Sequence, residues 1–173
     1  MTYYDCLTEA MSRLSREPQV LFLGQSIAYP GQAMHDTLKD VPMSKRREFP
    51  VAEDFQMGYS LGLALTGILP VCIYPRFDFL LLAANQLVNH LDKLPEMEWP
   101  AAKVIIRVAV GSQQPINAGP QHTQDHTQAF ACMLHNVRVR SLYRAEQIIP
   151  AYESAARRPE STLLIEYASE YYK

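Results

Sequence analysis

The stretch FPVAEDFQMGYSLGLAL, residues 49–65, carries an acid at the head of an apolar run. Glu53 follows PVA, with no Ser, Thr or Asn before it, and an acid in a first helical turn gains a few tenths to about 1 kcal/mol from the helix dipole. Gly58 and Gly62 follow one turn apart, and each costs ~1 kcal/mol against alanine inside a helix. Such glycines favour close approach of another backbone, which would shield the Glu53 carboxylate from water and make its protonation tunable.

Two aromatic residues form the second feature with possible chemistry. In YPRFDF, residues 74–79, Phe77 and Phe79 directly follow an apolar run. We expect one of the rings to fill the core. The other can be offered to a flat heterocycle, because aromatic faces stack on planar groups.

The densest polar cluster is GPQHTQDHTQ, residues 119–128. His122 and His126 are four residues apart and can share one helix face, with Asp125 close by. This spacing suits a metal-dependent hydrolase built on these three residues, although H-E-x-x-H and a clear third ligand are missing. A functional histidine at a helix N-terminus is equally compatible. Phosphate loops of the G-x-G-x-x-G and Walker kinds and C-x-x-C pairs do not occur.

Alternating apolar strands and helices must position these residues. The predicted strands are 20–24, 69–75, 102–110, 137–141 and 161–167, and the predicted helices are 3–16, 31–39, 53–67, 78–94, 124–134 and 144–157. Strands that are nearly continuous in apolar residues predict an α/β three-layer sandwich with a mainly parallel central sheet, as one domain over residues 1–173. Ligands bind at the carboxyl ends of such strands, so we expect a site at the loops after Gly24, Tyr74 and Val110, near Glu53.

Composition limits the class of protein. Hydrophobic residues make up 48% of the 173 residues, charged residues 20%, and the net charge is −2. Without a basic stripe or an acidic tail, nucleic acid and anionic membrane are not expected partners. Cys6, Cys72 and Cys132 are far apart, which predicts reduced, packed thiols in a cytoplasmic protein. The first residues lack the apolar core of a signal peptide, and no apolar window is long enough to span a bilayer.

Taken in order, these segments resemble the pyrimidine-binding domain of thiamine diphosphate enzymes, most closely the beta subunit of 2-oxo acid dehydrogenases and the middle domain of transketolases. The family pattern of an acid, four residues, glycine, three residues and glycine stands here as PVAEDFQMGYSLG. A G-x-x-P strand with F-x-F follows as GILPVCIYPRFDF, then D-Q-x-x-N as NQLVN (85–89) and Q-H-S-Q as QHTQ (121–124). The likeness runs from about Leu7 to Tyr167.

The resemblance implies roles for particular residues. Glu53 would hydrogen-bond N1′ of the cofactor's aminopyrimidine, which favours the imino tautomer that takes the C2 proton and generates the ylid. Phe79 would stack on the pyrimidine, and His122 falls where the family keeps a histidine that handles substrate or intermediate. Phe77 and Gln25 are further predicted cofactor contacts.

The sequence departs from the family pattern at several positions. Gln25 and Ser26 replace the acids of the family's G-E-D/E motif, Asn85 replaces an aspartate, and Asp125 and His126 are additions.

The resemblance also implies an incomplete site. The G-D-G…N signature that holds Mg²⁺ and the diphosphate is missing, as is the C-terminal domain of the larger family members. We therefore expect a separate alpha-like subunit with the diphosphate-binding domain, an α₂β₂ heterotetramer, and an intersubunit contact at Gly58 and Gly62. The activity implied is carbon–carbon bond cleavage or formation on a 2-oxo acid or ketose-like substrate, by a transketolase-like transferase or a decarboxylase-like lyase. A non-catalytic assembly partner of such an enzyme is the alternative.

Overall fold

Six parallel strands form the centre of the molecule. The computed structural model describes residues 1–100, 102–112 and 117–173; residues 113–116, in the loop predicted after Val110, lie outside them. The strands are β1 (Val20–Gly24), β2 (Arg46–Glu48), β3 (Leu69–Tyr74), β4 (Ile105–Val110), β5 (Arg138–Leu142) and β6 (Thr162–Tyr167). Their order is β2-β1-β3-β4-β6-β5, and every pairing is parallel. The predicted α/β fold with a parallel central sheet is therefore confirmed.

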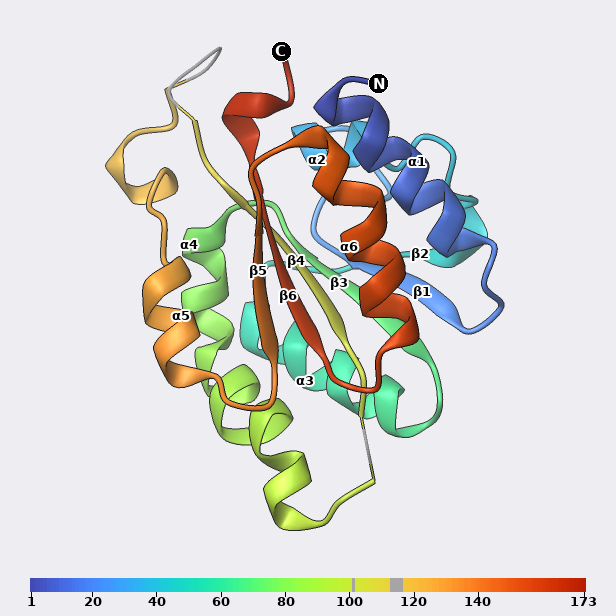
Figure 1. Cartoon of the computed structure of the whole chain (residues 1–173), viewed down its shortest axis with the longest axis vertical. Helices are drawn as coiled ribbons and strands as arrows, with labels where there is room; N and C mark the ends of the chain where they lie inside the picture. Colours follow the sequence, from blue (N-terminus) through green and yellow to red (C-terminus); the bar gives the residue numbers. More distant parts are fainter. Residues whose placement is uncertain (101, 113–116) are drawn as a thin grey trace.

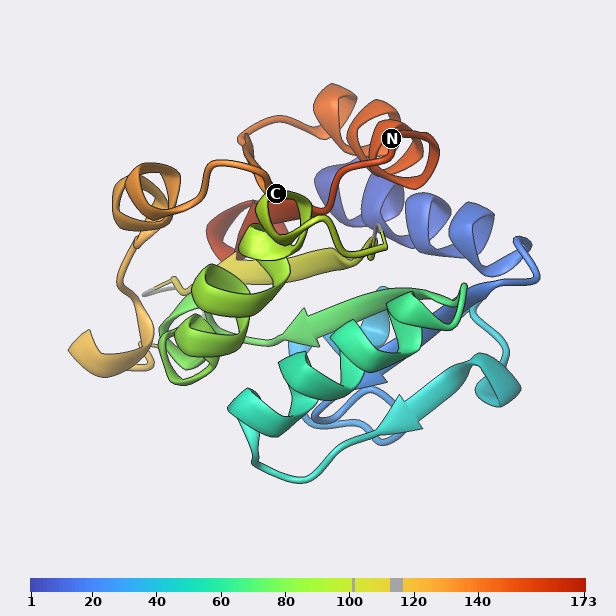
Figure 2. The same cartoon turned by 90° about the horizontal axis from the view of Figure 1, so that it is seen from below.

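Helices cover both faces of this sheet (Figures 1 and 2). The α-helices are α1 (Tyr3–Ser15), α2 (Ala33–Asp36), α3 (Glu53–Leu65), α4 (Phe77–Leu80), α5 (Thr127–Met133) and α6 (Ala145–Arg157). The shorter or irregular helical segments are η1 (Met43–Lys45), η2 (Leu81–Ala83), η3 (Gln86–His90), η4 (Leu91–Met97), η5 (Pro120–His122) and η6 (Ala168–Glu170). Helices α1 and α6 pack together on one face, and α3, α4 and α5 lie on the other.

The two layers bury two hydrophobic clusters. One lies between the sheet and α1 and α6, and the other between the sheet and α3, α4, η4 and α5. Strands β3 and β4 are buried along their whole length because both of their faces are covered. This burial explains why their sequences read as continuous apolar runs.

Helix α1 is held to two segments that lie far along the chain. The hydroxyl of Tyr3 donates to the carbonyl of Leu142 at 2.6 Å and accepts the backbone N–H of Tyr167 at 3.2 Å. Beside it, the fully buried Arg107 forms an ion pair with Glu166, with Nε to Oε1 at 2.6 Å and Nη2 to Oε2 at 3.0 Å. The hydroxyls of Tyr152 and Tyr171 also donate to Glu166. The interior polar groups thus join β4, β6, α6 and the segment after β6.

Several predicted helices differ from those observed. The predicted helix 78–94 follows a helical path as α4, η2, η3 and η4, but its hydrogen-bonding pattern changes, and η4 runs past the expected stop at Pro95 to Met97. Apolar spacing does not distinguish these closely related helix types. The predicted helix 124–134 begins only at Thr127, because Oδ1 of Asp125 accepts the Thr127 N–H at 2.9 Å. The predicted helix 31–39 is limited to Ala33–Asp36.

The prediction for residues 25–48 missed strand β2. Its three residues pair with Phe22, Leu23 and Gly24 of β1 at the edge of the sheet. Short, charged sequences are typical of edge strands, which do not need an apolar pattern. The strand matters here because two of its side chains hold the loop that follows β1.

Helix α3 begins and ends as predicted, but its glycines have other surroundings. Gly67 follows the helix at φ 89°, and its N–H donates to the carbonyl of Ala64 at 3.1 Å, which is a glycine cap. A Cβ on Gly58 would lie 3.5 Å from the side chain of Gln86, whereas one on Gly62 would meet nothing within 4 Å. The expected close approach of a second backbone is therefore absent among the described residues of this chain, and the intersubunit contact stays a prediction.

Two further expectations can be compared with the structure. Cys6 and Cys72 are buried free thiols as predicted, but Cys132 is exposed, so the expectation of packed thiols is wrong for that residue. Within residues 1–100, 102–112 and 117–173, we find no helix that combines the length and apolar character needed to cross a membrane.

Candidate active site at the carboxyl ends of the strands

The side chains of Glu53 and Gln25 are in contact at the carboxyl ends of the strands. Glu53 is the first residue of α3, and its side chain is nearly buried, with 6% of the residue exposed. Nε2 of Gln25, which directly follows β1, donates a hydrogen bond to Oε1 of Glu53 at 3.1 Å. No described residue donates to Oε2. The predicted neighbourhood of the loop after Gly24 and the start of α3 is therefore confirmed, and half of a mostly buried carboxylate is left for another donor.

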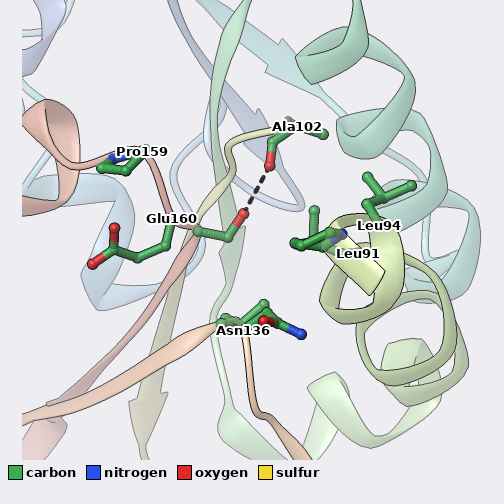
Figure 3. A pocket seen from close by; sticks show the side chains of 9 residues that line it. Leu91, Leu94, Ala102, Asn136, Pro159 and Glu160 are labelled. Atoms are coloured by element: carbon green, nitrogen blue, oxygen red, sulfur yellow. Dashed lines mark hydrogen bonds between the residues drawn. The ribbon is translucent and has the colours of Figure 1, made fainter. Parts of the chain in front are cut away.

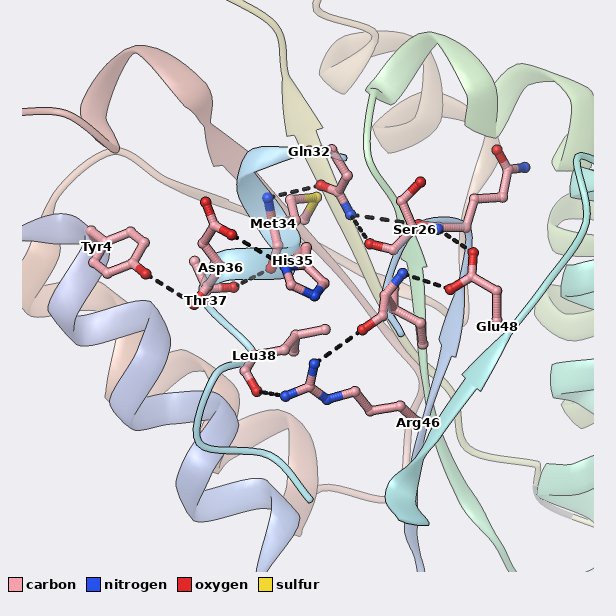
Figure 4. Close-up of polar contacts among 12 residues, drawn as sticks. Tyr4, Ser26, Gln32, Met34, His35, Asp36, Thr37, Leu38, Arg46 and Glu48 are labelled. Carbon is pink, nitrogen blue, oxygen red and sulfur yellow. Dashed lines mark hydrogen bonds and ion pairs between the residues drawn. The ribbon is translucent and has the colours of Figure 1, made fainter. Parts of the chain in front are cut away.

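Glu48 fixes the loop that carries Gln25 (Figure 4). Its Oε1 accepts the N–H of Ser26 at 2.5 Å, and its Oε2 accepts those of Ile27 and Ala28 at 2.9 and 2.8 Å. Ser26 has φ 52°, the left-handed conformation that lets successive N–H groups point to one carboxylate. Gln32 adds a bond from Nε2 to the carbonyl of Ser26 at 3.1 Å.

Arg46 holds the far end of the same loop. Its buried guanidinium donates to the carbonyls of Ile27 and Val41, with Nη1 to Ile27 at 3.2 Å and Nη2 to Val41 at 2.8 Å, and also to that of Leu38. Strand β2 therefore binds the loop with a carboxylate on its N–H groups and a guanidinium on its carbonyls. Because these bonds join fixed backbone groups, the position of Gln25 is set before any ligand binds.

The start of α3 is tied to the end of β3 as well. The hydroxyl of the buried Tyr74 donates to the backbone carbonyl of Glu53 at 3.0 Å. Burial raises the pKa of Tyr74 well above its ordinary value of 10.0, so the phenol stays a donor at neutral pH. One turn on, Nε2 of Gln56 donates to the carbonyl of Ile73 at 3.0 Å. These bonds prevent α3 from sliding along the sheet.

The two phenylalanines after β3 have different surroundings. Phe77 is fully buried, with its ring stacked on Phe130 at 5.4 Å and edge-on to His126 at 5.5 Å. Phe79 is half-buried, with its ring perpendicular to that of His122 at 5.4 Å. One ring therefore fills the core, as expected, and Phe79 is the ring left near the surface. Nothing in the structure tests the predicted cofactor contact of either ring.

His122 lies against the loop after β4. A Cβ on Gly111 would sit 1.9 Å from the backbone carbonyl oxygen of His122, so only glycine permits this approach. The contact and the Phe79 ring together place His122 beside the ends of β3 and β4. The structure thus brings His122 to the carboxyl ends of the strands, as predicted, where Glu53, Gln25 and Phe79 also lie.

The side chains of His126 and Asp125 contact other residues and not His122. Nε2 of His126 is 3.5 Å from Oδ1 of Asp78, which also accepts a hydrogen bond from Gln124 at 3.0 Å. Asp125 accepts the N–H of Thr127, and its Oδ2 accepts the hydroxyl of Tyr167 at 3.2 Å. Among the residues that the structure describes, no group of three or more His, Cys, Asp or Glu could hold a metal ion. The alternative of a metal-dependent hydrolase is therefore not supported.

A separate hollow of about 220 Å³ lies at the other ends of the strands (Figure 3). Ala102 precedes β4, Asn136 and Val137 precede β5, and Ser161 precedes β6, with Ser161 donating to the carbonyl of Ala102 at 3.3 Å. It contains none of the predicted site residues, so we do not assign the candidate site to it.

Sequence reasoning missed the residues that support the site. Glu48, Arg46 and the hydroxyl of Tyr74 belong to none of the motifs that the sequence offered. A weak signal existed in RRE, where the first and third residues of a strand point to the same face. Nothing in the sequence indicated that the side chains on this face would bind the loop after β1.

Comparison with known proteins supports the predicted resemblance. No family model matches the sequence. The pyruvate dehydrogenase E1 component subunit beta of Drosophila melanogaster is 27% identical over 173 residues, covering 96% of this chain and 46% of the relative. The corresponding subunit of Chaetomium thermophilum is 28% identical, covering 95% and 44%. The chain therefore spans about half the length of these relatives.

Solved structures show the same fold. A protein described as a split gene transketolase, in an inactive beta4 tetramer, has a TM-score of 0.73 at 16% identity, covering 96% of this chain and 51% of that one. The transketolase of Campylobacter jejuni has a TM-score of 0.71 at 14% identity, covering 95% and 25%. A putative thiamin diphosphate-dependent enzyme from Mycobacterium smegmatis has a TM-score of 0.61 at 16% identity, covering 96% and 30%.

These findings confirm the two coarse predictions. The chain is related in sequence to pyruvate dehydrogenase E1 beta subunits, and its fold is that of transketolase-like enzymes. The fold is shared as well with the putative thiamin diphosphate-dependent enzyme from Mycobacterium smegmatis.

Proposed function

We propose that this chain is the pyrimidine-binding subunit of a split thiamine diphosphate-dependent enzyme that cleaves or forms a carbon–carbon bond. The observation that carries the proposal is the environment of Glu53, which is 6% exposed: Gln25 donates to its Oε1, and none of the residues that the structure describes donates to its Oε2. Oε2 is not one of the fully buried oxygens that lack a partner, so it is open to a ligand that can donate a hydrogen bond to it. A protonated ring nitrogen such as N1′ of an aminopyrimidine is a matching donor.

The surrounding residues fit the same ligand. Glu53 would hold the shared proton at Oε2, while the Gln25 bond keeps Oε1 from turning away. Phe79, half-buried beside His122, offers a ring that a pyrimidine can cover. His122 would exchange a proton with the substrate at the same edge. Bound thiamine diphosphate would supply the carbon nucleophile, and this chain would set its protonation and orientation.

The rest of the site would come from a partner. The sequence relatives are themselves named beta subunits, and we propose a separate alpha-like subunit that holds the diphosphate and Mg²⁺, in an α₂β₂ assembly. An exposed apolar surface on and beside α3 supports this partner: Val51, Phe55, Tyr59 and Leu65 are 80%, 59%, 43% and 38% exposed. The rings of Phe49, Phe55 and Tyr59 lie 5.2–6.0 Å apart within it. Surfaces of this kind mark protein contacts.

The substrate class also belongs to the proposal. We propose a 2-oxo acid or a ketose-like donor, handled by transketolase-like transfer or decarboxylase-like cleavage. We also propose a cytoplasmic location, although relatives include mitochondrial proteins.

The test is Glu53→Gln in the complex of this chain with its diphosphate-binding partner. We expect the variant to assemble but to lose at least about a hundredfold in kcat, because the amide cannot exchange the proton. The matched control is Asp54→Asn, since Asp54 is the exposed neighbour, bonded only weakly to Gln86 at 3.4 Å. Full activity of Glu53→Gln would contradict the proposal and would favour the non-catalytic assembly partner instead.

A second measurement examines the division of the site. The purified chain alone should bind thiamine diphosphate poorly. The complex of this chain with its partner should bind thiamine diphosphate more tightly. Tight binding by this chain without any other polypeptide would count against a split site. Elemental analysis of the isolated chain adds a check on the hydrolase alternative, for which stoichiometric zinc or manganese is required.

A further inference from the structure

A hollow of about 150 Å³ lies beside the candidate site, at the same ends of the strands. Its walls come from four segments: the start of α2 with the residues before it, the turn between β3 and α4, the loop after β4, and the segment after β6. The lining residues are Gly31, Gln32, Ala33, Arg76, Ser112, Ala168 and Tyr172. We call it the Arg76 pocket. A smaller hollow of about 30 Å³ shares Gln32, Ala33, Arg76 and Ala168 and extends the pocket toward Ala109 and Tyr171.

Arg76 gives the pocket its charge. Its side chain is half-buried, and no described residue accepts a hydrogen bond from its guanidinium or pairs with it. The carboxylates of neighbouring segments are bound to other groups: Glu166 to Arg107, Glu170 to Lys173 at 2.6 Å, and Asp78 to Gln124. A guanidinium that is partly withdrawn from water without a partner favours an anion, and its planar fork matches a carboxylate or a phosphate.

The other walls suit a small polar ligand. The side chain of Gln32 is fixed, since its Oε1 accepts the N–H of Met34 at 2.8 Å and its Nε2 donates to the carbonyl of Ser26. Ser112 and Tyr172 also line the pocket, and the small side chains of Ala33 and Ala168 leave space within it. A volume of about 150 Å³ is sufficient for a carboxylate or phosphate group.

The pocket adjoins each part of the candidate site. The carbonyl of Arg76 accepts the N–H of Phe79 at 3.2 Å, so the two residues belong to one helical turn. Ser112 follows Gly111, which contacts the backbone of His122. Gln32 is bonded to the loop that carries Gln25. An anion in the pocket would therefore lie next to the residues assigned to the cofactor and to proton exchange.

We propose that the Arg76 pocket binds the carboxylate or phosphate group of a small anionic ligand. The statement that this ligand is the substrate rests on the proposed function; the statement that the pocket binds an anion does not. Arg76 supplies the bidentate contact and the charge, and the fixed Gln32 side chain with Ala33 and Ala168 forms the walls around the anion.

The experiment on anion binding uses the ¹⁵N-labelled full chain, titrated with sodium phosphate and with sodium acetate at constant ionic strength. We expect saturable shifts of the Gly31, Ala33 and Ser112 amides and of the Arg76 Nε–H. In Arg76→Gln the dissociation constant should rise about tenfold or more, because charge-assisted bonds are lost. Arg76→Lys, which keeps the charge without the fork, should give an intermediate value.

The control variant is Arg144→Gln, since Arg144 is an exposed arginine outside the pocket, with a side chain 75% exposed. It should leave the dissociation constants unchanged. Tighter binding of acetate identifies a carboxylate ligand, and tighter binding of phosphate identifies a phosphate ligand. Shifts that do not saturate, or that are the same in Arg76→Gln, would overturn the proposal.

A kinetic experiment on the assembled enzyme connects the pocket to the substrate. Arg76→Gln should raise KM about tenfold for either a 2-oxo acid or a sugar phosphate, with kcat changed much less. An unchanged KM for both would overturn the substrate role of the pocket. Failure of the proposed function would give a different result. The assembled complex would then lack thiamine diphosphate-dependent activity, while the isolated chain would still bind the anion.

Discussion

Nε2 of Gln25 donates a hydrogen bond to Oε1 of Glu53, and this contact joins the end of β1 to the start of α3. In Gln25→Ala the nearly buried carboxylate loses its only side-chain donor among the described residues. We expect the free energy of unfolding to fall by about 1.5–3 kcal/mol, the range for hydrogen bonds to charged groups. Urea denaturation measures this change. Gln128→Ala, on the exposed side of α5, is the control, and an equal loss in both variants would refute the role of the bond.

Replacement of the two phenylalanines after β3 should give opposite results. Phe77→Ala opens a cavity in the core beside Phe130 and should lower the free energy of unfolding by about 3–5 kcal/mol. Phe79→Ala removes a half-buried ring and should cost much less stability, but should weaken thiamine diphosphate binding in the complex. Denaturation and cofactor titration of the same two variants separate these effects. Similar cofactor affinity for Phe79→Ala and the natural chain would remove Phe79 from the site.

The exposed rings on α3 offer a test of assembly. Phe55→Glu places a charge in the centre of this apolar surface, where a partner would have to bury it. We expect the hetero-complex to dissociate on size-exclusion chromatography, while the isolated chain keeps its circular dichroism spectrum. Met43→Glu, at a separate residue that is 56% exposed, should still assemble. Normal assembly of Phe55→Glu would place the partner on another face.

Asp92 should make the fold sensitive to acid. Although its burial favours the neutral acid, the backbone N–H groups of Asn136, Val137 and His135 donate to its carboxylate and hold its pKa below the ordinary value of 3.8. A folded-state pKa below the unfolded one stabilises the fold above that ordinary value, and the stabilisation is lost as pH falls through the folded pKa. Denaturation midpoints measured from pH 7 to pH 2 should therefore fall more steeply for the natural chain than for Asp92→Asn. Parallel curves would assign the acid sensitivity to other groups.

Many of the helices and strands follow from the spacing of apolar residues along the sequence. The strands at 20–24 and 69–74 and the helix from Tyr3 were predicted to within a residue or two, because apolar spacing alone determines which faces are buried. The order of the strands did not follow from local spacing. Strand β2 and the short helical segments after α4 depend on tertiary contacts that no short window contains.

The candidate site was also predictable in part. Glu53, Phe79 and His122 were predicted from motifs that resemble those of a known family, and the parallel strands bring the chain segments that carry them together. The supporting bonds of Glu48 and Arg46 were not found, since each joins backbone groups about twenty residues away in sequence. A sequence shows which groups can donate and accept, but it does not show which backbone groups a loop will present to them.

The bonds of Tyr3 have a consequence for synthesis on the ribosome. Its partners Leu142 and Tyr167 are 139 and 164 residues away. At about 5–20 residues per second, α1 would wait roughly 8–33 s for the second of them to be made. Until translation has passed Arg157, which takes up most of that interval, the apolar side of α1 has no α6 to cover it. The nascent chain therefore passes through a stage in which its first helix is a target for chaperones, and the domain closes only after translation has nearly reached its last strand.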